Sequence, residues 1–430
     1  MGRFPLVPTL PAAERALLVG VEGLQGSWPV DRSLDELSRL AATAGAEEVA
    51  RLTQRLERPS PRTYIGSGKV EELCRLVHAL SVDVVIFDDD LSPSQQANLE
   101  RAVGEPVKII DRTALILDIF GLHATTREGR LQVQLAQLQY LLPRLRGMWS
   151  HLAKEQTRGG IGSRFGQGET QLEVDRRLIR RRIATLKREL ELLSRRRGVQ
   201  AKVRNDSAMF RIALAGYTNA GKSSLLNALT GAAVLAQDKL FATLDPTTRA
   251  FHLPGGRDVT ITDTVGFIQK LPHGLVEAFK STLAEAREAD LIAVVVDASD
   301  DDCGRHIDAV MQVLREIGAS STPTLMVFNK IDQIDADAVR ALSHLHPDAI
   351  FCSALTGLGI EELVSRLSEE AARQDDLLEL VMPYSEGNAI SLLRRISRVI
   401  AEEYGERGVR LVVKIPHRYS ARFSNWRSDL

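Results

Sequence analysis

The chain has 430 residues, and its 55 Lys and Arg against 56 Asp and Glu give a formal net charge of -1. Its apolar fraction of 44% is enough to form sizeable cores and excludes disorder over the whole length. No apolar run approaches the roughly 20 residues that a membrane-spanning helix needs, and the first residues lack a signal-peptide pattern. The three cysteines are too far apart to suggest a disulfide framework or a metal cluster. We therefore expect a cytoplasmic protein without a membrane span, which leaves peripheral association open.

Residues 1–120 are predicted to form a small α/β domain, because strand-like and helix-like patterns alternate along them. Strand patterns occupy residues 16–21, 49–56, 82–87 and 107–110, and helical patterns occupy residues 33–42 and 68–80, with another helix opening at Ser92-Pro93. The third strand ends in Asp88, Asp89 and Asp90. These aspartates either bind a metal or cap and solubilise a strand end, and we favour the second interpretation.

Residues 121–205 are predicted to form a helical hairpin. The pattern is helical up to about residue 146, and a charged helix follows from residue 171 to about residue 197. Between them, residues 157–170 hold five glycines in fourteen positions, which is too many for a helix. The basic segment, residues 144–211, has 18 Lys and Arg against 7 Asp and Glu, a net of +11, so the rest of the chain sums to -12. Neutrality is therefore a cancellation, and this segment could face nucleic acid.

A phosphate-binding pattern begins the next domain, residues 206–373. The strand-like residues 211–215 lead into Gly216-Tyr217-Thr218-Asn219-Ala220-Gly221-Lys222-Ser223 and then into a helix, which matches G-x-x-x-x-G-K-[ST] in the setting that the chemistry requires. In such a loop the backbone N–H groups surround the phosphates. We expect Lys222 to neutralise the β- and γ-phosphates and Ser223 to bind Mg²⁺.

Three further motifs follow in order, each after a predicted strand. Asp263-Thr264-Val265-Gly266 could hold Mg²⁺ through water at Asp263 and contact the γ-phosphate through the Gly266 N–H. The Asp332 carboxylate of Asn329-Lys330-Ile331-Asp332 fits the N1–H and 2-amino donors of guanine, and a backbone N–H of Ser353-Ala354-Leu355 could reach the guanine oxygen. All four motifs are expected at the carboxyl ends of strands in a doubly wound sheet. The sequence therefore predicts a GTP-hydrolysing enzyme.

Residues 374–430 are predicted to form a small α+β domain. One amphipathic helix, residues 389–404, lies between two short apolar stretches, which suggests a βαβ-like module. The last fifteen residues are polar and are expected to be mobile.

With these motifs the chain resembles the translation-factor-related P-loop GTPases. Residues 240–249 resemble the first switch of the Obg–HflX superfamily, and residues 166–183 and 271–292 are similar to segments of the HflX family itself. The resemblance implies a P-loop GTPase domain, preceded by an α/β domain with a long helical hairpin and followed by a small C-terminal domain. It implies that Thr243 completes the Mg²⁺ shell, with Thr247 as the rival by position, and that Lys222, Thr243 and Gly266 are the catalytic residues. The Mg²⁺ set would be Ser223, Thr243 and, through water, Asp263. The remaining expected nucleotide contacts come from the first switch: Phe241, Ala242, Thr243, Leu244 and Asp245.

Two features bear on the rate of hydrolysis. Phe267 stands where many GTPases place a glutamine that orients the attacking water, so we expect slow intrinsic hydrolysis that a partner raises. Phe267 is either a hydrophobic cover near the site or a packing residue. Asn219 occupies a loop position that helps to bind a catalytic K⁺ in some related GTPases. The alternative is that asparagine is there only because it tolerates the unusual backbone geometry of the turn.

The resemblance also implies a partner, the large ribosomal subunit and its rRNA. The action would be GTP-dependent splitting or rescue of stalled or idle ribosomes. The alternative is a GTP-gated binding factor for assembly or silencing of the large subunit, without splitting. Arginines of the basic segment would contact RNA phosphates, whereas the plain interpretation is a solvated helix face with Glu173 paired to Arg176 or Arg177. We expect a monomer.

Overall fold

The computed structural model describes residues 13–23, 28–155, 167–205, 209–231, 240–241, 246–254, 257–270, 285–373, 375–406 and 408–428. The chain divides into two compact units, which are treated separately below. The first unit comprises Met1–Leu190 with Lys239–Phe241 and Lys270–Ala278. The second comprises Glu191–Asp238, Ala242–Gln269 and Phe279–Leu430.

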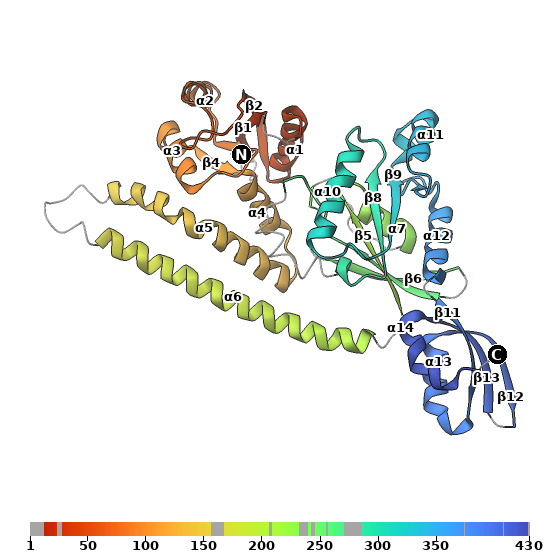
Figure 1. The fold of residues 1–430 in the computed structure, drawn as a ribbon. Helices are drawn as coiled ribbons and strands as arrows, with labels where there is room; N and C mark the ends of the chain where they lie inside the picture. The colour runs from red at the N-terminus through yellow and green to blue at the C-terminus, as the bar shows by residue number, and fades with distance from the viewer. Residues whose placement is uncertain are drawn as a thin grey trace, which may run out of the picture. The chain divides into compact units, whose positions relative to one another are not determined.

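The first unit is built on a four-stranded parallel sheet in the order β2-β1-β3-β4 (Figure 1). Strands β1 and β3 are central and apolar on both faces, as expected for a parallel sheet that helices cover. Ser92 begins α3 with a capping box, in which its hydroxyl accepts the Gln95 N–H and the Gln95 side chain accepts the Ser92 N–H. The elements are β1 (Glu14–Glu22), α1 (Val30–Thr43), β2 (Ala46–Arg55), α2 (Ser67–Ala79), β3 (Val84–Phe87), α3 (Pro93–Val103) and β4 (Lys108–Asp111).

Three helices follow: α4 (Arg112–His123), α5 (Arg127–Glu155) and α6 (Gln167–Asn205). Arg127 lies 3.8 Å from Glu189, and the Arg182 guanidinium donates to Gln134 at 3.0 Å. The contact made by the earlier residue of α5 is to the later residue of α6, so the two helices run antiparallel. They form the hairpin that the sequence predicts (Figure 1). Helix α6 begins four residues earlier than expected and takes in Gly168, whereas residues 157–166 of the glycine-rich stretch lie outside the described residues.

The second unit contains a six-stranded sheet in the order β10-β9-β8-β5-β7-β6, in which only the β6–β7 pair is antiparallel. Its strands are β5 (Phe210–Gly216), β6 (Thr247–Leu253), β7 (Arg257–Asp263), β8 (Leu291–Asp297), β9 (Thr324–Asn329) and β10 (Ile350–Phe351). Its helices are α7 (Lys222–Thr230), α10 (Cys303–Glu316), η1 (Ile331–Gln333), α11 (Ala336–Leu345) and α12 (Ile360–Arg373).

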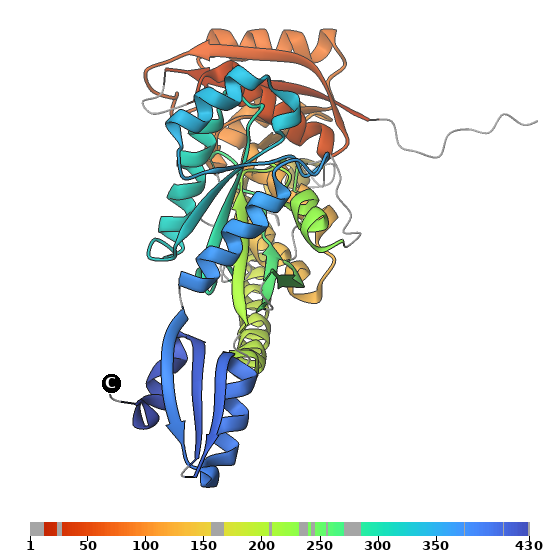
Figure 2. The ribbon, with the colours of Figure 1, turned by 90° about the vertical axis from the view of Figure 1, so that its right-hand side faces the viewer.

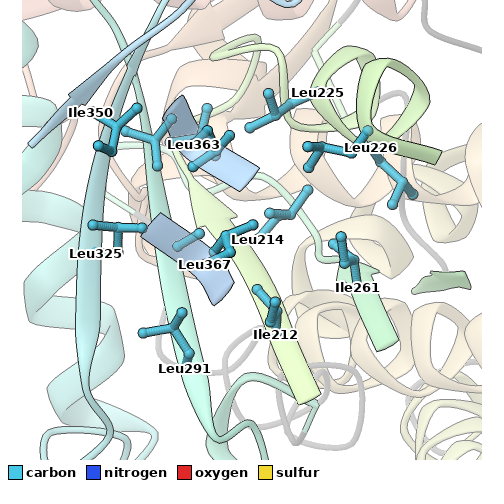
Figure 3. Packing of buried hydrophobic residues seen from close by; sticks show 14 of the residues in the cluster. Ile212, Leu214, Leu225, Leu226, Ile261, Leu291, Leu325, Ile350, Leu363 and Leu367 are labelled. Carbon is cyan, nitrogen blue, oxygen red and sulfur yellow. The ribbon is translucent and has the colours of Figure 1, made fainter. Parts of the chain in front are cut away.

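Aliphatic side chains form the core on one face of this sheet, as the low aromatic content requires (Figure 3). Leu225 of α7 and Leu363 of α12 pack onto Leu214 of β5 and its neighbours. Helix α10 contacts β8 and β5, and its Val310 and Leu314 are buried. Burying each such side chain stabilises the fold by about 1.5–3 kcal/mol. The rigid sheet between these layers fixes the carboxyl ends of β5, β7 and β9. This α/β arrangement confirms the expected fold class.

The C-terminal part of the second unit differs from the sequence prediction. It is a three-stranded sheet in the order β11-β13-β12 with α13 packed on it (Figure 2). Since β11 and β12 both pair antiparallel with β13, they run parallel to each other and are connected through α13, with β13 inserted between them. The expected helix over residues 389–404 ends at Ile396, and the residues after it form a strand. The final segment is ordered: Phe423 is buried, and Leu380 forms a β-bridge with Arg427. The elements are β11 (Asp375–Met382), η2 (Tyr384–Glu386), α13 (Gly387–Ile396), β12 (Arg398–Gly405), β13 (Gly408–Pro416), α14 (His417–Ser420) and η3 (Ala421–Trp426).

Over the part of the chain that the structure describes, every helix is too short or too polar to cross a membrane.

Candidate functional site

The loop from Gly216 to Ser223 joins β5 to α7 as the phosphate-binding pattern requires. Gly221 has φ of +88°, and a Cβ there would lie 2.2 Å from the side-chain nitrogen of Asn329, so only glycine fits. Asn219 also has a positive φ, 63°. Lys222 and Ser223 are the first residues of α7, so the loop's N–H groups and the helix N-terminus are directed to one place.

Lys222 is buried, and its ammonium donates to backbone carbonyl oxygens of the phosphate loop. Its Nζ donates to the carbonyl of Tyr217 at 2.8 Å and to that of Gly216 at 3.2 Å. Burial lowers the pKa of Lys222 to about 8, and the nearby Asp263 carboxylate acts in the opposite direction. The Thr218 hydroxyl is also buried and has no hydrogen-bond partner within the described residues. A buried ammonium and a spare hydroxyl beside backbone N–H groups fit a polyphosphate.

Asp263 and Ser223 supply oxygen atoms next to this loop. Asp263 is the last residue of β7 and is fully buried, and it accepts the Ser223 hydroxyl at 2.6 Å. The Thr264 hydroxyl donates to the Leu214 carbonyl at 2.8 Å and so fixes the end of β7 against β5. A hydroxyl and a carboxylate in contact are a donor set that suits Mg²⁺, which keeps several waters and takes one or two protein ligands beside the phosphates.

Asn329, at the end of β9, connects two loops. Its amide nitrogen donates to the Ala220 carbonyl of the phosphate loop at 2.9 Å, and its amide oxygen accepts the Ala354 N–H at 2.9 Å. The next residue, Lys330, has φ of +64° and donates to Asp297 at 2.6 Å. Asp332 lies in the 3-10 turn η1 with its side chain exposed. Asp332 and residues 353–355 therefore follow neighbouring strands, β9 and β10, at the same edge of the sheet.

The structure describes most of the predicted site. Within the second unit it brings to the carboxyl edge of one sheet the residues Gly216, Tyr217, Thr218, Asn219, Ala220, Gly221, Lys222, Ser223, Asp263, Thr264, Val265, Gly266, Asn329, Lys330, Ile331, Asp332, Ser353, Ala354 and Leu355. Ala242, Thr243, Leu244 and Asp245 lie outside the described residues, so the expected switch threonine has no structural account. Phe267 is buried, with 1% of its surface exposed.

Two residues near the expected nucleotide site belong to the first unit: Phe241, from the expected first switch, and Lys270, which follows the Asp-x-x-Gly segment. Phe241 packs edge-on against Phe120 of α4, with ring centroids 4.6 Å apart. The Lys270 ammonium donates to both Asp88 and Asp89 at 2.5 Å. Sequence reasoning named Phe241 as a nucleotide contact and did not find Lys270. The only signal for Lys270 was the acidic run at residues 88–90, which needs a cation wherever it is buried.

The expectation that residues 88–90 cap and solubilise a strand end is wrong for Asp88. Its carboxylate is 2% exposed, forms an ion pair with Arg112 at 2.7 Å, and accepts the Ser33 hydroxyl at 2.6 Å. Arg112 also pairs with Glu36 in the same buried cluster. Among the described residues, no group of three or more His, Cys, Asp or Glu could hold a metal. The aspartate is therefore part of a buried ionic network.

A phosphate loop at the end of β5, an Asp-x-x-Gly segment at the end of β7 and Asn-Lys-x-Asp at the end of β9 define a P-loop GTPase. The family model described as "GTP-binding GTPase N-terminal" matches residues 31–121, "GTP-binding GTPase Middle Region" matches residues 123–204, and "50S ribosome-binding GTPase" matches residues 211–330. The chain is 45% identical to the GTPase HflX of Magnetococcus marinus over 95% of this chain and 94% of that one. It is 42% identical to the GTPase HflX of Escherichia coli over 94% of each. The chain belongs to the HflX GTPase family.

A solved structure that resembles the chain is that of a GTP-binding protein from the archaeon Sulfolobus solfataricus in complex with GDP. It is 26% identical, with 84% of this chain and 99% of that one covered, and the TM-score is 0.42.

Proposed function

We propose that this GTPase binds the large ribosomal subunit and uses GTP and Mg²⁺ to split or rescue stalled or idle ribosomes. The family model for its nucleotide domain, described as a 50S ribosome-binding GTPase, supports the choice of partner. The observation that carries the proposal is the arginine surface of α6: Arg176, Arg177, Arg180, Arg181 and Arg182. Four of these side chains are exposed, and Arg176 is half-buried.

The arginine surface is not neutralised by the helix that bears it. Within residues 173–195 of α6, no ion pair joins Glu173 to Arg176 or Arg177, although Arg195 does pair with Glu191 at 2.7 Å. This weakens the alternative of a solvated face with internal pairs. Unpaired guanidinium groups bind phosphate oxygens with two parallel hydrogen bonds, and each phosphate contact releases counterions. We infer that this face binds rRNA.

The catalytic roles follow the phosphate site. Lys222 would neutralise the β- and γ-phosphates, Ser223 and Thr243 would bind Mg²⁺, and Asp263 would hold the metal through water. The Gly266 N–H would contact the γ-phosphate as charge develops on it. Since Phe267 provides no side-chain group to orient water, the intrinsic rate would be slow until the ribosome orders the switches. K⁺ at Asn219 would add positive charge.

We propose that four segments share these tasks: 1–120 as an α/β domain, 121–205 as the RNA-binding hairpin, 206–373 as the GTPase domain and 374–430 as a small C-terminal domain. The protein would act as a cytoplasmic monomer, with peripheral membrane association left open.

Sedimentation of ribosomes tests the function. Whole ribosomes are mixed with the protein and GTP or a non-hydrolysable analogue and separated on sucrose gradients. Splitting predicts a loss of whole ribosomes and a rise in free subunits. If the protein sediments with large subunits while the subunit peaks stay constant, the alternative holds, a GTP-gated assembly or silencing factor.

Charge reversals on two different helices test the RNA-binding surface. Arg180→Glu with Arg181→Glu should weaken binding to large subunits at least tenfold and reduce its salt dependence, with basal GTPase activity unchanged. Arg340→Glu, on α11, reverses an exposed arginine that pairs with Asp337 and should leave binding unchanged. Equal effects of the two variants would contradict the assignment of the α6 face.

A further inference from the structure

The segment after β7 pairs with the phosphate loop beyond the end of the regular strands. In the sheet Leu214 pairs with Asp263. Pairing then resumes as an isolated parallel bridge between Tyr217 and Phe267. The Phe267 N–H donates to the Gly216 carbonyl at 3.1 Å, and the Phe267 carbonyl accepts the Thr218 N–H at 2.7 Å. The second-switch segment is therefore hydrogen-bonded to the phosphate loop on both sides of Tyr217.

This pairing holds Gly266 close against the loop. Three residues separate Asp263 from Phe267, whereas two separate Leu214 from Tyr217, so the second-switch segment bulges by one residue at this point. A Cβ on Gly266 would lie 2.9 Å from the Thr218 Cα and 3.1 Å from the Lys222 Nζ. Gly266 and Lys222, which would both contact the γ-phosphate, thus lie directly against each other.

The Tyr217 side chain adds a third link between the same two segments. Its hydroxyl accepts the Gln269 N–H at 2.7 Å, and both residues are buried. Its ring is stacked on that of His306 in α10, with centroids 3.9 Å apart and 25° between the planes. Because α10 packs on the sheet, the stack fixes the ring and therefore the hydroxyl. The Tyr217 hydroxyl thus connects the phosphate loop to the second switch, and helix α10 holds the ring in place.

We propose that Tyr217 is a positioning residue, supported by His306, that holds the second switch against the phosphate loop until a γ-phosphate displaces it. A γ-phosphate requires two groups of the protein, the Lys222 ammonium and the Gly266 N–H. In this structure the ammonium donates instead to the carbonyls of Gly216 and Tyr217. GDP has no γ-phosphate and therefore does not need the Gly266 N–H, although its β-phosphate would still be neutralised by Lys222. The link therefore favours the GDP-bound protein over the GTP-bound protein, because a ligand shifts a conformational equilibrium only through its different affinities for the two states.

Nucleotide affinities of three variants of the full chain test the proposal. Tyr217→Phe removes the hydroxyl, and with it the hydrogen bond from the Gln269 N–H, and keeps the stacked ring. Affinity for a non-hydrolysable GTP analogue should rise about fivefold relative to affinity for GDP, as measured with fluorescent nucleotides. His306→Leu should change this ratio in the same direction by releasing the ring. Tyr404→Phe, on β12, also removes a tyrosine hydroxyl, and should leave the ratio unchanged.

The ratio separates positioning from general damage. A purely structural loss would weaken both nucleotides equally, and thermal unfolding monitored in parallel identifies a variant that no longer folds. An unchanged or lowered ratio in folded Tyr217→Phe overturns the proposal. If that variant does not fold, the same result in folded His306→Leu overturns it.

Discussion

Lys270 and Asp88 form an ion pair across 182 positions of the sequence, with the ammonium donating to the Asp88 carboxylate. Asp88 directly follows the central strand β3, and Lys270 comes four residues after Gly266 of the Asp-x-x-Gly segment. Lys270 has φ of +53°, an unusual backbone conformation for a lysine. Lys270 is thus held in the buried ionic cluster of the first unit.

Lys270→Met should destabilise β3 in a pH-dependent manner. Burial raises the pKa of Asp88, and Lys270 opposes that rise, so without the ammonium the pKa rises further. At a pH above that pKa the variant contains a carboxylate that has lost one cation, and local opening should become easier by about 2 kcal/mol. Below it Asp88 is protonated, and the difference should shrink. Hydrogen exchange of the β3 amides, measured in the variant and the original protein from acid to neutral pH, follows this difference.

Lys108→Met provides the matched control for that experiment. Lys108 pairs with Glu14, but 61% and 49% of these side chains are exposed, so its loss should matter little. If the two variants changed the exchange of β3 equally, or if the effect of Lys270→Met were the same at acid pH, the ion pair would not be stabilising the cluster.

Nucleotide affinity should decrease as the pH rises through the pKa of Lys222. In the free protein burial lowers this pKa to about 8, so at pH 9 most Lys222 side chains are neutral. Phosphate groups favour the ammonium, so binding must then take up a proton, and affinity for GDP should fall about tenfold between pH 7 and pH 9. Calorimetry in buffers with different ionisation enthalpies measures both the affinity and the proton uptake.

The Lys222→Arg variant shows whether Lys222, and not another group of the site, causes this pH dependence. In Lys222→Arg the guanidinium stays protonated throughout this pH range, so its binding of GDP, though weaker, should vary little with pH. A pH profile identical to that of the original protein would assign the titration to another group.

The local motifs were predictable, and the contacts between distant segments were not. Each nucleotide motif directly follows a buried strand, and the strand registers of a parallel sheet bring such ends together. Lys270 has no sequence pattern that marks it, because its partner is set by tertiary packing. The same holds for the stack between Tyr217 and His306, whose residues lie on different elements.

The main error in the fold has a comparable cause. Ile396, Val399, Ile400 and Tyr404 have spacings that suit one face of a helix, and this favoured a helix over residues 389–404. Val399 and Ile400 are β-branched, and β12 pairs with β13 along its length, so tertiary pairing determined the structure. Phe423 was the overlooked signal in the tail, since a buried aromatic anchors a segment that is otherwise polar.

Asp332→Asn should change the preferred base. If Asp332 accepts the N1–H and 2-amino donors of guanine, the amide loses that charge-assisted pairing, and affinity for GDP should fall about 10- to 100-fold while affinity for the xanthine nucleotide rises. Competition between the two diphosphates measures the switch. Asp335→Asn is the matched control, because Asp335 caps α11 at 2.7 Å and asparagine caps equally well. An equal loss for both bases would indicate damage to η1 instead.

Hydrolysis should be faster in KCl than in NaCl, by about tenfold, if Asn219 helps to bind K⁺ near the phosphates. Asn219 has φ of +63°, a conformation that asparagine tolerates, so the geometry is also compatible with a role in the turn alone. Asn219→Gly separates these roles, because glycine keeps the backbone conformation and loses only the side chain. The K⁺ role predicts that this variant binds GDP normally and loses the difference between the two salts. If the original protein hydrolyses GTP at the same rate in both salts and Asn219→Gly matches it, Asn219 serves the turn.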